Sequence, residues 1–230
     1  MTRGLPLAPR TGERKLQILQ TLATMLEHPR GERVTTAALA ARLDVSEAAL
    51  YRHFASKAQM FEGLIEFVEQ SLFGLINQIS AEQTDGMRQA QSIMTVLLTF
   101  AEKNPGIVRV LIGDALIHED ERLQVRINQL LDRIESTLRQ ALRIAQASDR
   151  RHDGSAEAVA QTVTTAAPGA GASAAGTTAA GRGGASTSDT TAAHANLMLC
   201  HVIGRWQQYA RSGFRRKPTE HWPQQWVFIA

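Results

Sequence analysis

Four polar side chains that can bind phosphate lie in one short stretch near the N-terminus. They are a hydroxyl, a phenol, an imidazole and an ammonium, supplied by Thr35, Tyr51, His53 and Lys57. Groups of this kind, together with backbone amides at helix N-termini, hold the sugar–phosphate backbone of DNA and set the register of a protein on the duplex. The chemistry that these residues favour is DNA binding.

The elements that must position these side chains are two short helices joined by a tight turn, over residues 34–54. Thr35 or Thr36 can cap the first helix and Ser46 the second, because a hydroxyl that precedes a helix accepts an amide hydrogen of its first turn. Five apolar residues are spaced to meet in the corner between the helices: Leu39, Ala40, Leu43, Val45 and Leu50. The second helix then turns its outer face to solvent, and its small alanines can enter a major groove. The same pattern also fits a plain corner in an α-helical protein.

A modest excess of positive charge supports the DNA-binding interpretation. Residues 1–60 contain nine Arg or Lys and five acidic residues, a net charge of +4, whereas the whole chain carries +3. A basic segment suits a polyanion, although an excess of this size also occurs on ordinary solvated surfaces. The candidate DNA contacts are Thr35, Thr36, Ser46, Glu47, Ala48, Ala49, Tyr51, Arg52, His53 and Lys57.

Apolar residues recur at helical spacing along most of the chain. Aromatic residues make up only 5% of it, and alternating β-branched runs, which strands need, are scarce. Asn104-Pro105-Gly106 separates two helices, because proline disfavours helical geometry before it and lacks an amide donor. The sequence predicts an all-α protein. The expected helices cover residues 16–26, 36–43, 46–52, 57–79, 84–103, 106–117 and 120–147.

The composition changes after residue 147. From 148 to 191 the chain is built almost wholly of Ala, Gly, Ser and Thr, which bury too little apolar surface to offset the entropy of ordering. A helix that is apolar on nearly every side follows from about Ala193, and cover by a second subunit is favoured over a deep position in a monomer. The expected organisation is a disordered N-terminal arm (1–12), a helix-turn-helix domain (13–57), a helical body (58–147), a flexible insertion (148–191) and a C-terminal dimerisation helix with its tail (192–230).

Composition also excludes several kinds of site. Cys200 is the single cysteine, so the chain has neither an internal disulfide nor a cysteine-based metal site, and its apolar neighbours predict a buried thiol. Residues 1–10 lack the apolar core of a signal peptide, and no run of about 18 apolar residues could span a bilayer. We expect a cytoplasmic protein without a membrane span, a metal or a cofactor.

The order of residues in the two short helices resembles the N-terminal domain of the TetR family of DNA-binding regulators. The resemblance covers about residues 14–65 and depends on the Thr-Thr, Leu-Ala and Val-Ser pairs, the run Tyr51-Arg52-His53-Phe54, and Lys57. It implies a TetR-like fold: a three-helix DNA-binding domain and a helical domain for dimerisation and partner binding. It also implies a homodimer that reads a palindrome in double-stranded DNA. Asp44 stands where glycine is common in the left-handed turn, a conformation that Asp tolerates.

Four segments behind this domain resemble the nucleoid occlusion factors, a family of the TetR type. They are residues 64–69, 103–106, 120–130 and 212–219, the last leading to Trp222. The resemblance implies a nucleoid-associated protein that binds palindromic chromosomal sites. When bound to DNA, it inhibits assembly of the FtsZ ring over the nucleoid and so coordinates cell division with chromosome segregation. The family's arginine on the partner face falls at Leu75, and its glycine falls at Thr99. The partner-binding residues that the resemblance implies are Phe67, Val96, Thr99, Lys103 and Asn104.

Helical periodicity gives a check on that face. At 100° per residue, Phe67 lies at the edge of the buried stripe of helix 57–79, which is formed by Met60, Leu64, Ile65, Val68, Leu72, Leu75, Ile76 and Ile79. In helix 84–103, Val96, Thr99 and Lys103 share a face separate from the stripe of Ala90, Ile93, Met94, Leu97 and Ala101. Without the resemblance, Phe67 and Val96 would be taken to broaden the core.

Two other classes of function compete with nucleoid occlusion. A ligand-responsive TetR repressor would enclose a small-molecule pocket, but the internal candidates Phe100, His118 and His201 make a poor lining. An enzyme is disfavoured because the chain lacks a glycine-rich phosphate loop, a nucleophile elbow and a His-x-x-x-His metal pair. The sequence therefore predicts neither a catalytic nor a metal site, and the ligand-responsive repressor is the alternative function.

Overall fold

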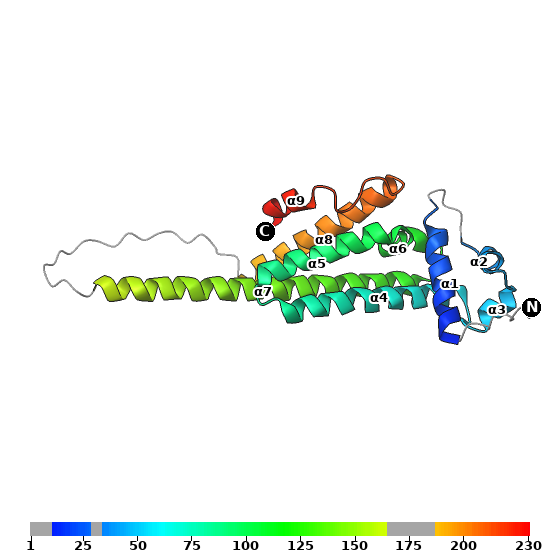
Figure 1. The fold of residues 1–230 in the computed structure, drawn as a ribbon, viewed down its shortest axis with the longest axis horizontal. Coiled ribbons are helices and arrows are strands. Elements are labelled where there is room, and N and C mark those ends of the chain that lie inside the picture. Colours follow the sequence, from blue (N-terminus) through cyan, green and yellow to red (C-terminus); the bar gives the residue numbers. More distant parts are fainter. Residues whose placement is uncertain (1–10, 29–33, 165–186) are drawn as a thin grey trace, which may run out of the picture.

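The computed structural model describes residues 11–28, 34–164 and 187–230, which form helices and connecting turns without a strand. The predicted all-α class is confirmed. The described residues form an elongated molecule with a small head at one end and long helices behind it (Figure 1). No helix within these ranges is both long enough and apolar enough to cross a bilayer.

Three helices form the head: α1 (Thr11–Leu26), α2 (Thr36–Arg42) and α3 (Glu47–Tyr51). α2 contacts both α1 and α3. The apolar corner predicted between α2 and α3 is confirmed, because Leu39, Ala40 and Leu50 are buried, while Leu43 and Val45 pack against the same core.

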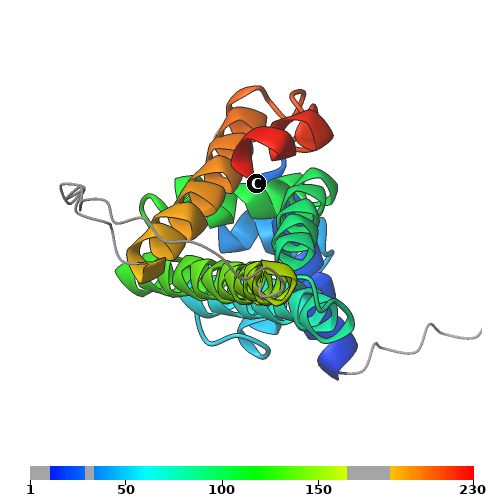
Figure 2. The same ribbon diagram turned by 90° about the vertical axis from the view of Figure 1, so that its left-hand side faces the viewer.

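Four long helices form the body, and their buried side chains make one continuous core with the head (Figures 1 and 2). They are α4 (Lys57–Glu82), α5 (Gly86–Lys103), α7 (Glu121–Thr164) and α8 (Thr187–Arg211). α5 and α7 each contact the other three long helices, so these two helices join α4 to α8. The predicted stripe of α5 is confirmed, since Ala90, Ile93, Met94, Leu97 and Ala101 are all 0% exposed.

Three short elements complete the fold of the described residues. Two of them lie between the body and the head, and the third covers the outer side of the body. They are α6 (Pro105–Leu111), the 3₁₀ turn η1 (Asp114–Leu116) and α9 (Trp222–Ile229). A single helix over 106–117 was predicted, but the α-helix ends at Leu111 because Gly113 adopts a left-handed conformation, with φ of 80°. The nearest atom to a Cβ on Gly113 would be Oε1 of the flexible Gln124 side chain, which can move, so the left-handed backbone is what favours glycine in this turn.

The head is held to the body by close contacts between α1 and α6. A Cβ on Gly106 would lie 1.9 Å from the carbonyl oxygen of Ala23, so only glycine permits this approach. Arg109 donates from Nη1 to the carbonyl oxygens of Leu26 and His28, each at 3.3 Å, and thereby satisfies acceptors at the C-terminus of α1. The position of the head therefore depends on α6.

The long helices extend further than predicted. Residues 148–164 continue α7 and residues 187–191 begin α8, so the expected flexible insertion is wrong for these two parts. Alanine is the best helix former, and a helix that is already nucleated extends at little cost, so a lack of large apolar residues does not end it. Thr191 is buried and donates to Oε1 of Gln146 at 2.9 Å. Residues 165–186, like residues 1–10 of the expected N-terminal arm, lie outside the described residues.

Two residues predicted to be buried are exposed. Leu75 of α4 is 45% exposed, because the buried side of that helix is already filled by Leu72 and Ile76 on neighbouring turns. Cys200 of α8 is also exposed, because Met198, Leu199 and Val202 fill the inner side of α8. The apolar character of α8 thus includes an outer stripe that the described part of this chain leaves uncovered.

Candidate DNA-binding head and partner face

Both short helices of the head have the predicted hydroxyl caps. Oγ1 of Thr35 accepts from the amide of Ala38 at 3.1 Å, and Oγ of Ser46 accepts from the amide of Ala49 at 3.3 Å. Each bond satisfies an amide that has no partner within its helix, which stabilises the short helix by about 1 kcal/mol. Thr36 is not a cap, and its hydroxyl donates to Oε2 of Glu47 at 2.6 Å. That bond ties the first turn of α2 to the first turn of α3.

The turn between α2 and α3 has the expected left-handed residue. Asp44 has φ of 53°, and the chain then reverses so that the amide of Val45 donates to the carbonyl oxygen of Ala40 at 3.0 Å. This geometry sets the angle between the two helices. The helix-turn-helix is therefore built as the sequence predicts, with aspartate in the glycine position.

The outer face of α3 is exposed to solvent. Glu47, Ala48, Tyr51 and Arg52 are exposed, with Tyr51 at 45%. Ala49 and His53 are half-buried, and the buried Nδ1 of His53 has no hydrogen-bond partner among the described residues. The exposed groups at the tip of the head are the phenol of Tyr51, the guanidinium of Arg52, the methyl group of Ala48 and the carboxylate of Glu47.

Lys57 lies elsewhere, at the junction between head and body. Its ammonium forms an ion pair with Glu119, which lies just before the start of α7. The same ammonium lies 5.6 Å from the centroid of the Phe61 ring. The Lys57 side chain is 23% exposed and that of Glu119 is 11% exposed. In this conformation Lys57 therefore connects α4 to the turn before α7, and reaching a phosphate would require it to leave Glu119.

The five predicted partner-binding residues lie along α4 and α5. Phe67 is 37% exposed, Val96 and Thr99 are half-buried, and Lys103 is exposed. Asn104 differs from the other four. It ends α5, and its Nδ2 donates to the carbonyl oxygen of Phe100 at 2.7 Å, so its amide already has an acceptor within the chain.

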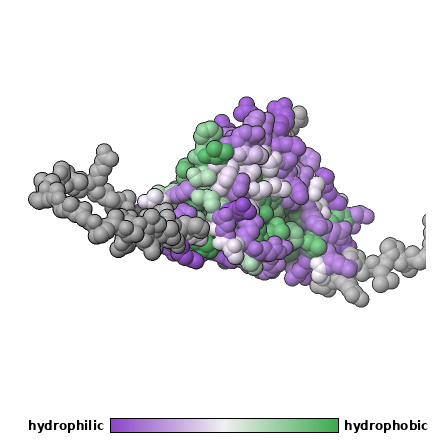
Figure 3. All heavy atoms as spheres, turned by 60° about the vertical axis from the view of Figure 1, so that its left-hand side comes forward, coloured by the Kyte–Doolittle hydropathy of each residue, from purple (hydrophilic) through white to green (hydrophobic). Residues whose placement is uncertain are grey.

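Leu75 belongs to the same surface, although sequence reasoning placed it in the core. The turn between α4 and α5 is fixed by Gln83, which accepts from Gln89 and bonds Ser92. Counting along both helices from that turn places Leu75 within about one helical turn of Val96, and Phe67 within about one helical turn of Lys103. Figure 3, which looks onto α4, α5 and α9, shows apolar side chains at the surface between hydrophilic areas. The candidate partner face therefore combines exposed apolar side chains with a lysine.

Comparison with known proteins places this chain in a family. Residues 30–64 match the model of the tetR family of bacterial regulatory proteins, and residues 84–167 match the SlmA-like, tetracyclin repressor-like C-terminal domain. The nucleoid occlusion factor SlmA of Shewanella halifaxensis is 46% identical over 216 residues, which cover 94% of this chain and 92% of that protein. The chain belongs to the SlmA family of nucleoid occlusion factors. The SlmA of Alteromonas mediterranea is 44% identical and covers 97% of this chain and 96% of its own.

Solved structures agree on the fold of this SlmA-family chain. A TetR transcription regulator from Haloarcula marismortui superposes with a TM-score of 0.65 at 14% identity, covering 95% of this chain and 97% of its own. The fatty acid degradation regulator FadR from Bacillus halodurans superposes with a TM-score of 0.64 at 11% identity, covering 99% and 96%. At such identities the likeness concerns the fold alone, and it confirms the predicted TetR-like architecture.

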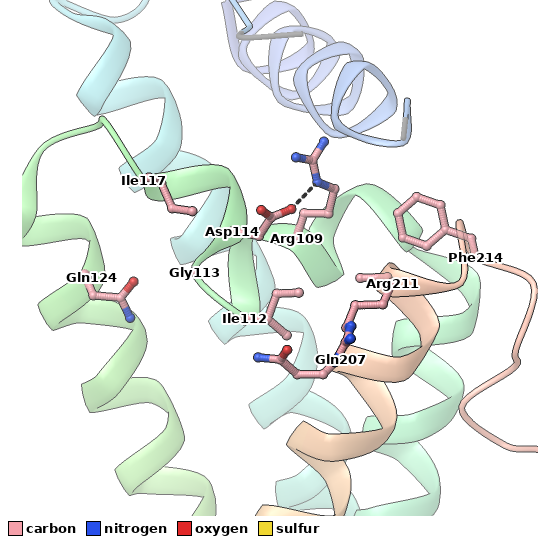
Figure 4. Close-up of a pocket in the computed structure, with 10 residues that line it drawn as sticks. Arg109, Ile112, Gly113, Asp114, Ile117, Gln124, Gln207, Arg211 and Phe214 are labelled. Carbon is pink, nitrogen blue, oxygen red and sulfur yellow. Dashed lines mark hydrogen bonds and ion pairs between the residues drawn. The ribbon is translucent and has the colours of Figure 1, made fainter. Parts of the chain in front are cut away.

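A hollow of about 550 Å³ lies where the head end of the body meets α8. Figure 4 shows Arg109 and Asp114 on one wall, Gln124 on α7, and Gln207, Arg211 and Phe214 on the wall formed by α8 and the segment after it. Nε of Arg109 donates to Oδ2 of Asp114 at 2.7 Å. None of Phe100, His118 and His201 lines this hollow, so the site differs from the internal pocket considered for a ligand-responsive member of the TetR type.

Proposed function

We propose that the chain acts as a homodimer that binds palindromic chromosomal sites through α3 and, when bound to DNA, inhibits assembly of FtsZ over the nucleoid. The observation that carries the proposal is the separation of two unpartnered surfaces, the tip of the head and the face along α4 and α5. A protein that links DNA to a division protein needs both surfaces at once. The high identity to SlmA proteins supports the same function, without a catalytic role.

On the DNA side, the proposed phosphate contacts come from both ends of the helix pair. The hydroxyl hydrogens of Thr35 and Ser46 remain available, because each oxygen acts only as an acceptor in its cap. Tyr51 and Arg52 add exposed donors beside the small Ala48. Thr36, Glu47, Ala49, His53 and Lys57 complete the proposed set of DNA contacts, in which the carboxylate of Glu47 can only accept a hydrogen bond and so would face a base and not a phosphate.

On the partner side, Phe67 supplies an aromatic anchor and Lys103 a charge that lies beside it. Aromatic side chains in the centre of an interface account for much of its affinity, and a neighbouring charge contributes to specificity. Val96 and Thr99 continue the surface along α5 toward the turn, and Leu75 adds apolar area on α4. This surface suits an apolar segment that carries acidic groups.

The outer stripe of α8 supports the homodimer. The residues of this stripe are alternately four and three positions apart in the sequence, which is the spacing that places side chains on the contact face between two packed helices. Leu197, 55% exposed, is the largest apolar side chain of the stripe, and nothing lies within 4 Å of a Cβ built on Gly204. We propose that a second copy covers this stripe, which consists of Ala193, Leu197, Cys200, Gly204, Gln207 and Arg211.

The hollow beside Arg109 favours the alternative, a ligand-responsive repressor. A ligand that moved Asp114 would disturb Arg109, which bonds the end of α1, and so would shift the head. In that case the chain would control one neighbouring operon.

Genome-wide mapping of bound sites separates these two functions. We expect many dispersed palindromes that spare the replication terminus, and we expect them to disappear when Tyr51→Ala is introduced as a control for specific binding. A single strong site beside an adjacent gene would overturn the occlusion proposal and favour the repressor.

A further inference from the structure

The segment that follows α8 runs back along α5 and is bonded to it at two points. At the first point Lys217 forms an ion pair with Oε1 of Glu102 at 3.0 Å, and the hydroxyl of Thr219 donates to the same carboxylate. At the second point Nε1 of Trp222 donates to Oγ1 of Thr95 at 2.8 Å. We call residues 212–229 the tail.

These two points lie on either side of the proposed partner face. Thr95, Thr99 and Glu102 share one side of α5, because they are spaced by four and three residues. Thr99 therefore lies between the two anchored residues, and Val96 and Lys103 each follow an anchored residue in the chain. α4 borders the exposed strip of α5 on one side, and the tail borders it on the other.

The tail is firmly seated. Trp222 is 5% exposed, with its ring 5.7 Å from that of His201 and 5.6 Å from that of Trp226. Tyr209, just before the tail, donates to the carbonyl oxygen of Glu102 at 3.2 Å. The pKa of Glu102 is lowered, chiefly by the hydrogen bond from Thr219 and then by Lys217, as expected for a carboxylate held by donors.

The outer side of α9 is apolar and uncovered. Val227 is 73% exposed and Phe228 is 87% exposed, although the opposite side of the same short helix is buried against α8 and α5. Figure 3 shows apolar side chains at the surface over α9, on the same side of the molecule as α4 and α5. Exposed apolar side chains that lie together on an anchored helix are a feature of sites that bind a partner.

We propose that the tail is the second wall of the FtsZ-binding surface. Trp222 and Lys217 act as positioning residues that hold the tail against α5. Val227 and Phe228 contact the same partner molecule that lies on Phe67 and Val96. The inference rests on the proposed function. Two observations identify this occupant: the tail is continuous with the α5 strip, and Lys103 and the 68% exposed Lys217 give both walls a basic rim. A stable interface buries about 800 Å² of surface on each partner. The few exposed side chains of α4 and α5 supply part of that area, and α9 adds to it.

The direct test is the double substitution Val227→Ser and Phe228→Ser in the full-length chain. Both side chains point to solvent, so folding, dimerisation and DNA affinity should stay unchanged, while the affinity of the DNA-bound protein for FtsZ should fall at least about tenfold. Co-sedimentation with FtsZ gives the affinity, and sedimentation velocity gives the oligomeric state. The matched control is Val125→Ser, which removes a 54% exposed apolar side chain of α7 outside the tail.

The positioning role is tested separately by Trp222→Phe, which keeps an aromatic ring but removes the bond to Thr95. We expect weaker FtsZ binding with unchanged DNA affinity, a combination that a general loss of stability would not give. Wild-type FtsZ affinity in both tail variants, together with lost affinity in Phe67→Ala, would overturn the tail proposal and leave the proposed function standing. A shift from dimer to monomer in the serine variant would also overturn it, because a second copy would then be the occupant. If the wild type did not bind FtsZ, both proposals would fail.

Discussion

Two roles compete for the ammonium group of Lys57 at the junction of head and body. The ion pair with Glu119 makes Lys57 part of the junction, whereas the proposed DNA contact requires it to face a phosphate. Lys57→Met keeps the stem near Phe61 and removes the charge. If Lys57 binds phosphate, DNA affinity should fall about equally for all sequences, and the slope of log K against log salt should become shallower by up to about 0.9.

Glu119→Gln is the matched variant for Lys57→Met, because it breaks the same ion pair but leaves the ammonium free. DNA affinity measured by fluorescence anisotropy should then be retained or raised. Equal losses in the two variants would assign Lys57 to the junction alone.

Glu102 predicts how the seating of the tail depends on pH. Because the hydrogen bond from Thr219 and the charge of Lys217 lower its pKa below 4.5, its contribution to stability is present above that value and is lost as pH falls through the folded pKa. The pKa of Lys217 is raised above 10.5, chiefly by its bond to Glu102, so its contribution is lost only as pH rises through that higher value. Tryptophan fluorescence should report loosening of the tail below the lowered pKa. Glu102→Gln should remove this acid transition, and an unchanged transition in that variant would assign it to another group.

At the scale of the elements, the contact between α1 and α6 controls the position of the head. Gly106→Ala should force α6 away from α1, because the new Cβ would lie 1.9 Å from the carbonyl oxygen of Ala23. Overpacking of this kind costs about 1–3 kcal/mol, so the melting temperature should fall. Gly74→Ala is the control: nothing lies within 4 Å of its Cβ, and replacing this helical glycine should stabilise by about 0.5–1 kcal/mol. Equal increases in melting temperature would contradict the close approach of α1 and α6.

Local chemistry made some elements predictable from the sequence. The caps at Thr35 and Ser46, the left-handed Asp44 and the apolar corner around Leu39 and Leu50 depend on neighbours a few residues away. Amphipathic spacing likewise predicted the buried stripe of α5.

The features that the sequence did not predict depend on distant neighbours. The exposure of Leu75 depends on which neighbouring helices cover α4, and the contact of Arg133 with the ring of Phe73, 4.0 Å from its centroid, marks the side that faces α7. The bonds from Trp222 to Thr95 and from Thr219 to Glu102 join residues more than 100 positions apart. Periodicity within one helix carries no information about such partners.

At the scale of the whole molecule, we propose that one chain binds DNA on its head and FtsZ on the face along α4 and α5. The double variant Phe67→Ala with Lys103→Glu removes the aromatic anchor and reverses the neighbouring charge, and it changes neither α3 nor the outer stripe of α8. The control with matched chemistry is Val125→Ala with Arg150→Glu, two exposed positions on α7 away from that face.

The decisive measurement is the affinity of FtsZ for the protein bound to palindromic DNA, by co-sedimentation, with DNA affinity measured by anisotropy on the same preparation. A central aromatic anchor is worth about 2 kcal/mol or more, so FtsZ affinity should fall well over tenfold in the Phe67→Ala, Lys103→Glu variant, with DNA affinity unchanged and the control equal to the wild type. Full FtsZ affinity in that variant would show that the face is wrongly placed. A wild type that fails to bind FtsZ even on DNA would contradict the occlusion function itself.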